Sequence, residues 1–157
     1  MPNVNRPDSI LRILLAAALA LCAGGPLHAA GGTPPGGLPC PPGWTVEPNA
    51  SVENSLSYAH LTRDLAVSVN YIADRAGPQV SPERYARVAA QKMLCSMPVM
   101  SNLIDGAWTF YCEDLGVEAV IYGPAGNLVM LAIAGRSEET EPLLENFIRF
   151  LAAQARH

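Results

Sequence analysis

The most reactive side chains of this sequence are those of four cysteines, Cys22, Cys40, Cys95 and Cys112, and of His60, because His28 lies in a predicted signal peptide and His157 is the last residue. A thiolate is a nucleophile, and an imidazole within hydrogen-bond reach can draw a thiol toward that form. A pair of His60 with Cys95 or Cys112 would therefore suit a thiol-dependent enzyme. No motif of such an enzyme surrounds these residues, so this is the least favoured function, and we expect no catalytic residue.

In an exported protein the same cysteines predict a disulfide, because an oxidising compartment preserves such bonds. Removal of a signal peptide would leave Cys40, Cys95 and Cys112, so at most one bridge forms within the chain. A Cys95–Cys112 bridge, a bridge from Cys40 to either of them, and three free thiols are the alternatives. A Cys95–Cys112 bridge would close a loop of about 17 residues and stabilise the fold by roughly 3 kcal/mol.

A group of closely spaced acidic residues is the other feature that could bind a ligand, namely a cation. It consists of Glu138, Glu139, Glu141 and Glu145. Acidic residues are favoured at the positive end of a helix, which explains the run without a bound cation. No set of residues has the spacing of a metal site, and nothing indicates a cofactor. A formal charge of −4, with a single lysine, gives no basic stripe that would bind nucleic acid.

The amino terminus, residues 1–29, has the pattern of a secretory signal peptide. Basic residues, the second of them Arg12, come before an unbroken apolar run over 13–21. That run is too short to span a bilayer, which needs ~20 residues, and a Gly/Pro cluster follows it. We expect cleavage after Ala29, with Ala30 as the alternative, and a periplasmic or secreted mature protein.

Cys22 offers a second export route. Leu19-Ala20-Leu21-Cys22 resembles a bacterial lipobox, in which the cysteine is diacylated and becomes the new amino terminus. The resemblance fails at Leu21, where a small residue is expected. Plain cleavage is therefore favoured over a membrane-anchored lipoprotein, and membrane attachment depends on this choice alone.

The mature chain is predicted to hold one domain behind a short arm. Residues 30–43 are rich in proline and glycine, which predicts a linker or loosely attached arm. The domain then covers 44–153 and begins with a short strand at Trp44. Alternating apolar residues over 55–73 predict a hairpin, whose apolar side chains share one face.

Two helices are predicted within the domain. Ser81-Pro82-Glu83 is a strong helix start, because serine can cap, proline suits the first turn and glutamate meets the positive end of the dipole. Its apolar stripe includes Val88, and it ends near Cys95. The final helix begins around Thr140 to Pro142 and carries apolar residues at helical spacing as far as Leu151.

The stretch Leu103 to Gly135 organises the rest of the chain as a meander of apolar strands. Asp105-Gly106 predicts a tight hairpin turn, in a register that places Val99 opposite Cys112. Leu128 to Ala134 is almost wholly apolar, which predicts a central strand covered on both faces. The whole order is β-β-β-α-β-β-β-β-α. It predicts an α+β fold with a mostly antiparallel sheet of about six strands, flanked by two helices.

This order resembles the PsbP-like fold of photosystem extrinsic proteins and their bacterial relatives. The resemblance is carried by Trp44-Thr45-Val46, Ser81-Pro82-Glu83-Arg84-Tyr85, the meander Trp108 to Ala134, and Leu143 to Leu151. It covers most of the mature chain, and the cysteines depart from it. It implies an accessory or binding domain in an exported compartment, with a sandwich of helices about a sheet. A cystatin-like or other helix-on-sheet fold is the alternative.

These features favour an exported, non-enzymatic accessory protein of the bacterial cell envelope. Its partner would be a protein that binds a sheet face or an edge strand. The alternative is a periplasmic protein that binds a small molecule or a lipid, which predicts an apolar pocket between the sheet and a helix.

Overall fold

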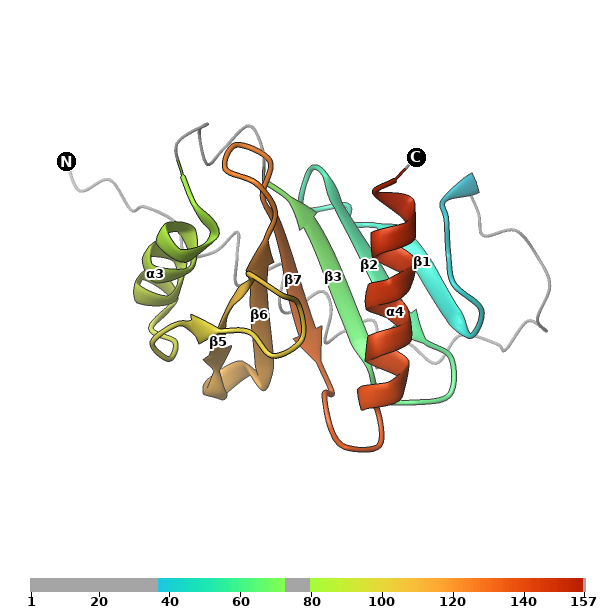
Figure 1. The fold of residues 1–157 in the computed structure, drawn as a ribbon. Coiled ribbons are helices and arrows are strands. Elements are labelled where there is room, and N and C mark those ends of the chain that lie inside the picture. The colour runs from blue at the N-terminus through green and yellow to red at the C-terminus, as the bar shows by residue number, and fades with distance from the viewer. Residues whose placement is uncertain (1–36, 73–79, 157) are drawn as a thin grey trace.

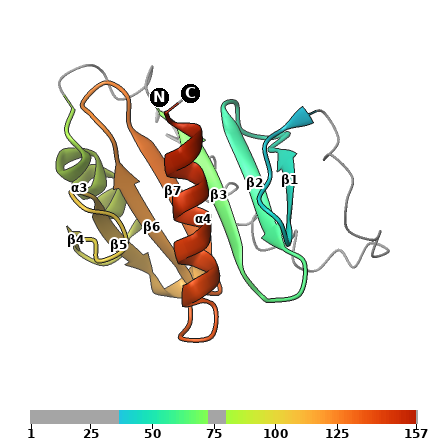
Figure 2. The same ribbon diagram turned by 45° about the vertical axis from the view of Figure 1, so that its right-hand side comes forward.

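A computed structural model of the protein describes residues 37–72 and 80–156. Within these, a seven-stranded antiparallel sheet carries one helix on each face (Figures 1 and 2). This confirms the predicted α+β class and element order, with seven strands instead of about six. The predicted signal peptide, its cleavage residues Ala29 and Ala30, and Cys22 lie outside the described residues. No helix in the described part of the chain is long and apolar enough to cross a membrane.

The sheet has the strand order β1-β2-β3-β7-β6-β5-β4. Its strands are β1 Trp44–Pro48, β2 Ser55–His60, β3 Ala66–Tyr71, β4 Val99–Met100, β5 Trp108–Cys112, β6 Val117–Tyr122 and β7 Val129–Ala134. The central strand is β7, which is buried along almost its whole length, as its apolar sequence predicted. In the β2–β3 hairpin Tyr58 lies opposite Val67, so their apolar side chains share one face, also as predicted.

Helix α4, Glu141–Gln154, covers one face of the sheet over β2 and β3 (Figures 1 and 2). Its apolar residues recur every three or four positions, and Leu144 and Phe147 are fully buried. The Phe147 ring packs against Trp44 of β1, with ring centroids 4.7 Å apart, and against Tyr58 of β2, 4.9 Å away. This aromatic cluster anchors α4 to the first two strands, and the helix begins where the sequence predicted.

Helix α3, Pro82–Met93, lies on the opposite face and packs on β5 and β6. Ser81 caps it as predicted, because its Oγ accepts a hydrogen bond from the N–H of Arg84 at 3.2 Å. The helix buries small residues, namely Ala86, Ala89 and Ala90. The prediction that Val88 belongs to the buried stripe is wrong, since this side chain is 46% exposed. The alanines face the sheet, and Val88 therefore lies on the outer side.

The predicted register of the β4–β5 hairpin is wrong by three residues. Val99 lies opposite Thr109 and not Cys112. The physical reason is that Asp105-Gly106 does not join the strands directly but lies inside a longer loop. That loop is closed by the N–H of Ser101, which donates to the carbonyl of Ala107 at 2.8 Å. Because a shift by an odd number of residues exchanges the two faces, Val99 faces the α4 side of the sheet.

Candidate functional site

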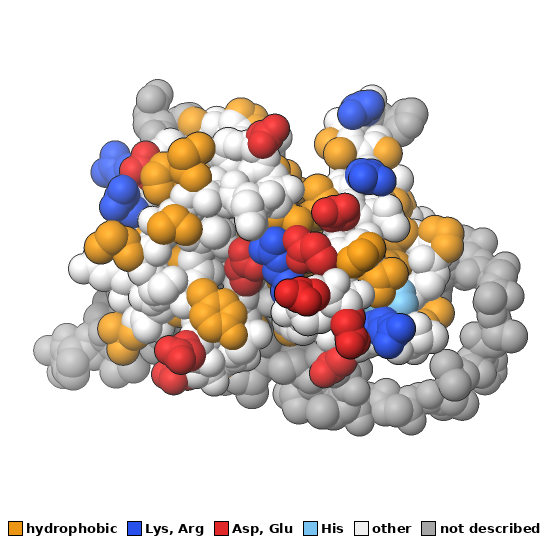
Figure 3. Space-filling model, turned by 60° about the horizontal axis from the view of Figure 1, so that its bottom comes forward, with side chains coloured by type: hydrophobic (Ala, Val, Ile, Leu, Met, Phe, Trp, Pro, Cys, Tyr) orange, Lys and Arg blue, Asp and Glu red, His pale blue; other side chains and the backbone are white. Residues whose placement is uncertain are grey.

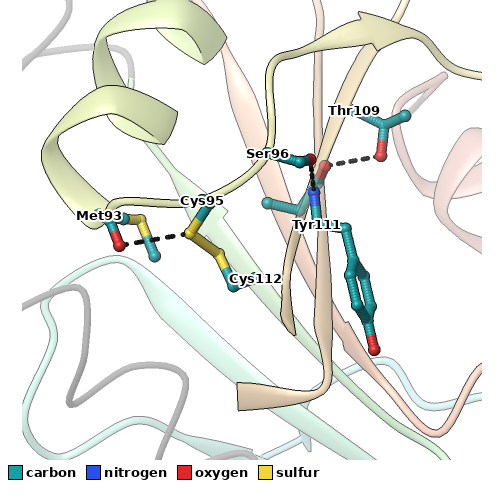
Figure 4. The surroundings of a disulfide bond; sticks show 7 residues. Met93, Cys95, Ser96, Thr109, Tyr111 and Cys112 are labelled. Carbon is teal, nitrogen blue, oxygen red and sulfur yellow. Dashed lines mark hydrogen bonds between the residues drawn. A yellow bond between two sulfur atoms is a disulfide. The ribbon is translucent and has the colours of Figure 1, made fainter. Parts of the chain in front are cut away.

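The structure joins Cys95 and Cys112 in a disulfide (Figure 4), with their Cα atoms 4.6 Å apart. This confirms one of the predicted pairings. The observed β4–β5 register explains this pairing, because it places Ser96, the residue after Cys95, beside Tyr111, the residue before Cys112. The N–H of Ser96 donates to the Tyr111 carbonyl at 2.9 Å, and the N–H of Tyr111 donates to Ser96 Oγ at 2.8 Å. The bridge and these two bonds fasten the segment after α3 to β5.

The alternative bridge from Cys40 is wrong, since Cys40 is a free, half-buried thiol. Its Sγ–H donates to the carbonyl of Trp44 at 3.1 Å, and burial raises the pKa of this thiol. The end of the predicted arm is held by packing instead. Leu38 and Cys40 contact the core, and the Tyr58 hydroxyl donates to the Pro39 carbonyl at 3.3 Å.

His60 lies at the end of β2, where its ring contacts neighbouring residues. Its ring meets Trp44 edge to face at 5.2 Å, and its Nδ1 accepts a hydrogen bond from the N–H of Thr62 at 3.3 Å. Burial, together with the Arg63 guanidinium, lowers the pKa of His60. Because Cys95 and Cys112 are bonded to each other, the structure does not bring either thiol to His60 as a nucleophilic pair.

A charged network that the sequence did not reveal lies where β7 leads into α4. Arg136 donates to Glu118 of β6 at 2.7 Å and to Glu141 of α4 at 2.7 Å, and it also reaches Asn102 Oδ1 at 3.2 Å. Figure 3 shows a basic side chain enclosed by acidic ones near the centre of this face. The hydrogen bond from Arg136 lowers the pKa of Glu141. Glu141, one of the four glutamates of the predicted acidic group, therefore forms an ion pair within the protein.

An open hollow of about 440 Å³ lies beside this network, between the β2–β3 turn (62–64) and the β7–α4 loop (135–140). The two segments approach closely at Gly135, where φ is +85° and a Cβ atom would overlap the carbonyl oxygen of Asp64. Polar and charged side chains line most of the hollow, in contrast to the apolar pocket predicted for a lipid-binding protein. Among the described residues, no three His, Cys, Asp or Glu side chains gather as metal ligands.

The most exposed of the large apolar side chains lie in one segment that ends in β4. We call Leu94, Met97, Val99 and Met100 the β4 patch. They are respectively 93%, 78%, 59% and 67% exposed. The patch starts where α3 ends, because Leu94 takes a left-handed conformation with φ of 57° and turns the chain away from the helix. The disulfide at Cys95 follows at once and holds the segment against the sheet.

The β4 patch coincides with a free edge of the sheet. β4 is an outer strand, and no other described strand pairs with its far side. The opposite outer strand, β1, presents the features that usually prevent pairing, because Glu47 is charged and exposed and Pro48 lacks an N–H group. On β4 itself, Val99 and Met100 are apolar and exposed. The β4 edge is therefore better suited than the β1 edge to pairing with another chain.

The exposed surface of α3 carries three basic residues, of which Arg87 is the one that a described contact places near β4. Arg84, Val88 and Lys92 recur every four residues and lie on one exposed side of the helix. Arg87, next to them, lies over the Trp108 ring at 5.7 Å from its centroid. Trp108 is in turn the cross-strand partner of Met100. Figure 3 shows separate hydrophobic side chains on the α3 side of the molecule, with basic side chains beside an acidic one at its outer edge.

Comparison with family models, curated proteins and solved structures found no match to this chain. The site consists of an apolar edge strand whose preceding segment is held to the sheet by a disulfide.

Proposed function

We propose that this protein is an exported, non-enzymatic accessory protein of the bacterial cell envelope that binds a protein partner through the β4 patch. The observation that carries the proposal is the exposure of four large apolar side chains within seven residues, none less than 59% exposed, at an open sheet edge. Full burial of one such side chain gains roughly 1.5–3 kcal/mol, so a partner that covers the patch would gain substantial binding energy.

The composition of the patch also supports a protein ligand. Two of its four residues are methionines, whose flexible, polarisable side chains adapt to the surface they meet. Exposed apolar side chains that gather in a globular protein commonly mark an interaction site, and these four lie within one seven-residue segment at a sheet edge. The PsbP-like resemblance implies the same kind of role, an accessory or binding domain.

Export is supported by two independent features. The amino-terminal sequence has the order of basic residues, apolar run and small residues that secretion requires. The Cys95–Cys112 disulfide suits an oxidising compartment, since such bonds rarely persist in the cytosol. We propose a periplasmic or secreted mature protein, with anchoring through Cys22 as the alternative.

The test is the native size of the protein in gently lysed cells that produce it. We expect the wild type to migrate as part of a complex, and the double variant Met97→Lys/Met100→Lys to migrate as the free domain. The matched control is Leu61→Lys, because Leu61 is also an exposed apolar residue (44%) but lies beyond β2, far across the sheet. Loss of the complex in the control alone, or free migration of the wild type, would contradict the proposal.

A further inference from the structure

We propose that Met97 and Met100 form a reversible oxidation site that controls the β4 patch: an oxygen-donating oxidant converts them to sulfoxides, and the patch then releases its protein partner. This inference rests on the proposed function and adds the regulation of the same surface. It is carried by the exposure of the two methionines, the protection of the other described sulfur atoms and the separation of both side chains from the core.

Met97 and Met100 are the accessible methionines of the described part of the chain. Their exposed fractions are 78% and 67%, whereas that of Met130 is 3%. Met93 is partly buried and packs against two of the hydrophobic clusters. Oxidation requires that the oxidant reach the sulfur atom, so susceptibility follows exposure. The two methionines of the β4 patch should therefore be oxidised first.

The described cysteines offer little competition for the oxidant. Cys95 and Cys112 are already joined in a disulfide. Cys40 is half-buried, its Sγ–H donates to a backbone carbonyl at 3.1 Å, and burial raises the pKa of this thiol. Because the thiolate is the form that attacks a peroxide, a raised pKa slows the oxidation of Cys40. Among the described sulfur atoms, the thioethers of the β4 patch are thus the most open to reaction.

The reaction is a two-electron transfer of one oxygen atom. The thioether sulfur attacks an oxygen of hydrogen peroxide, the O–O bond breaks, and a sulfoxide and water are formed, so the sulfur is oxidised and the peroxide is reduced. Methionine sulfoxide reductases reverse the change, because two thiols are oxidised to a disulfide while the sulfoxide oxygen leaves as water. In the oxidising compartment proposed above, a sulfoxide can therefore act as a reversible signal.

Oxidation changes the surface of the β4 patch and leaves the core as it is. Neither Met97 nor Met100 belongs to a described hydrophobic cluster, so a polar group on them disturbs no core packing. Two of the four large side chains of the patch become polar. A partner that covered a sulfoxide oxygen with apolar side chains would leave this hydrogen-bond acceptor unsatisfied. The expected result is loss of the partner from a domain that remains folded.

The site is tested by treating the purified mature protein with hydrogen peroxide and following each methionine by peptide mass spectrometry. Chymotrypsin separates them, because cleavage after Leu94 and Leu103 gives a peptide whose only methionines are Met97 and Met100. We expect these two to be oxidised at least about tenfold faster than Met130. Circular dichroism and urea denaturation should show an unchanged fold. Equal rates at the exposed and buried positions, or unfolding on oxidation, would overturn the inference.

The regulation is tested by the native size of the protein after it is added to a gentle lysate of host cells from which its gene has been deleted. The oxidised protein is freed of peroxide with catalase beforehand. We expect untreated protein to migrate in the complex, oxidised protein to migrate as the free domain, and methionine sulfoxide reductases to return it to the complex. The matched control is Met97→Leu/Met100→Leu, which keeps apolar side chains of similar volume but has no thioether in the patch. Its complex should survive treatment of the variant with peroxide.

Entry of the oxidised wild type into the complex would overturn the inference and leave the proposed function standing. Loss of the complex by the oxidised leucine variant would also overturn it, because the effect would then lie outside these two methionines. Free migration of the untreated wild type contradicts the proposed function, and the inference fails with it. If the leucine variant does not bind before oxidation, the wild type decides: the fraction released must follow the oxidation of Met97 and Met100 measured by mass, and any other dependence overturns the inference.

Discussion

The Cys95–Cys112 bridge and the exposed side chains beside it act together at the residue scale. The bridge follows Leu94 directly and, with the hydrogen bonds between Ser96 and Tyr111, holds the segment that carries Met97 against β5. The disulfide therefore contributes both to the stability of the domain and to the order of the site.

Replacing both cysteines, Cys95→Ser/Cys112→Ser, should lower the free energy of unfolding by roughly 3 kcal/mol, because the bridge closes a loop of 17 residues in the unfolded chain. Urea denaturation measures the change. A reducing agent should have the same effect on the wild type and none on the double variant. Cys40→Ser is the control and should change stability by less than about 1 kcal/mol, since its thiol makes one hydrogen bond to a backbone carbonyl. Equal losses in the two variants would contradict this role.

His60 should make stability depend on pH in the acidic range. Burial and Arg63 lower its pKa in the folded protein, whereas the unfolded chain protonates near the ordinary value of 6.5. The neutral imidazole therefore contributes fully to the free energy of unfolding above pH 6.5. This contribution is lost as the pH falls through the lowered pKa of the folded protein. Between about pH 7 and pH 5, the free energy of unfolding should fall more steeply for the wild type than for His60→Gln. Parallel profiles in urea denaturation would show that His60 is not the group responsible.

The turn from β7 into α4 is fixed at the element scale by the Arg136 network. One guanidinium joins β6, α4 and the β4–β5 loop through Glu118, Glu141 and Asn102. The Arg136 side chain is only 20% exposed. Because this ion-pair network is partly buried, the guanidinium compensates the negative charge of Glu118 and Glu141. This network positions the loop that leads into β5, and β5 in turn carries the β4 edge.

Arg136→Gln should lower the free energy of unfolding by about 2 kcal/mol, because it leaves two partly buried carboxylates without their cation. The matched control is Arg87→Gln, which breaks an exposed pair on α3 and should cost less than about 1 kcal/mol. Urea denaturation of both variants measures the difference. Similar losses at the two positions would mean that the network on this loop is no stronger than a surface ion pair.

Element boundaries followed from local chemistry, but strand register did not. The start of α3 was predictable because Ser81 and Pro82 act through neighbouring residues alone. The register of β4 on β5 depends on how the loop 101–107 folds back on itself, and the turn dipeptide in it gave the wrong alignment. The Arg136 network could not be predicted for the same reason, since the three partners of Arg136 come from three other segments of the sequence.

At the scale of the whole molecule, the predicted class and element order are confirmed, whereas the site emerged only from the three-dimensional arrangement. Leu94, Met97, Val99 and Met100 have the composition of core residues, and a sequence does not show which apolar residues end at an open edge. An edge strand was predicted as one general way to bind a partner, but not which strand. The distinction between the β1 and β4 edges depends on sheet order, which is a property of the complete fold.

The measurement that tests this account most directly is a photo-cross-linking scan in intact producing cells. A photoreactive amino acid is placed singly at each of six exposed apolar positions: Leu61, Tyr71, Leu94, Met97, Val99 and Met100. We predict that the four positions of the β4 patch cross-link to one and the same protein and that Leu61 and Tyr71 do not. Cross-links from Leu61 and Tyr71 with none from the patch would contradict the claim that β4 is the binding edge.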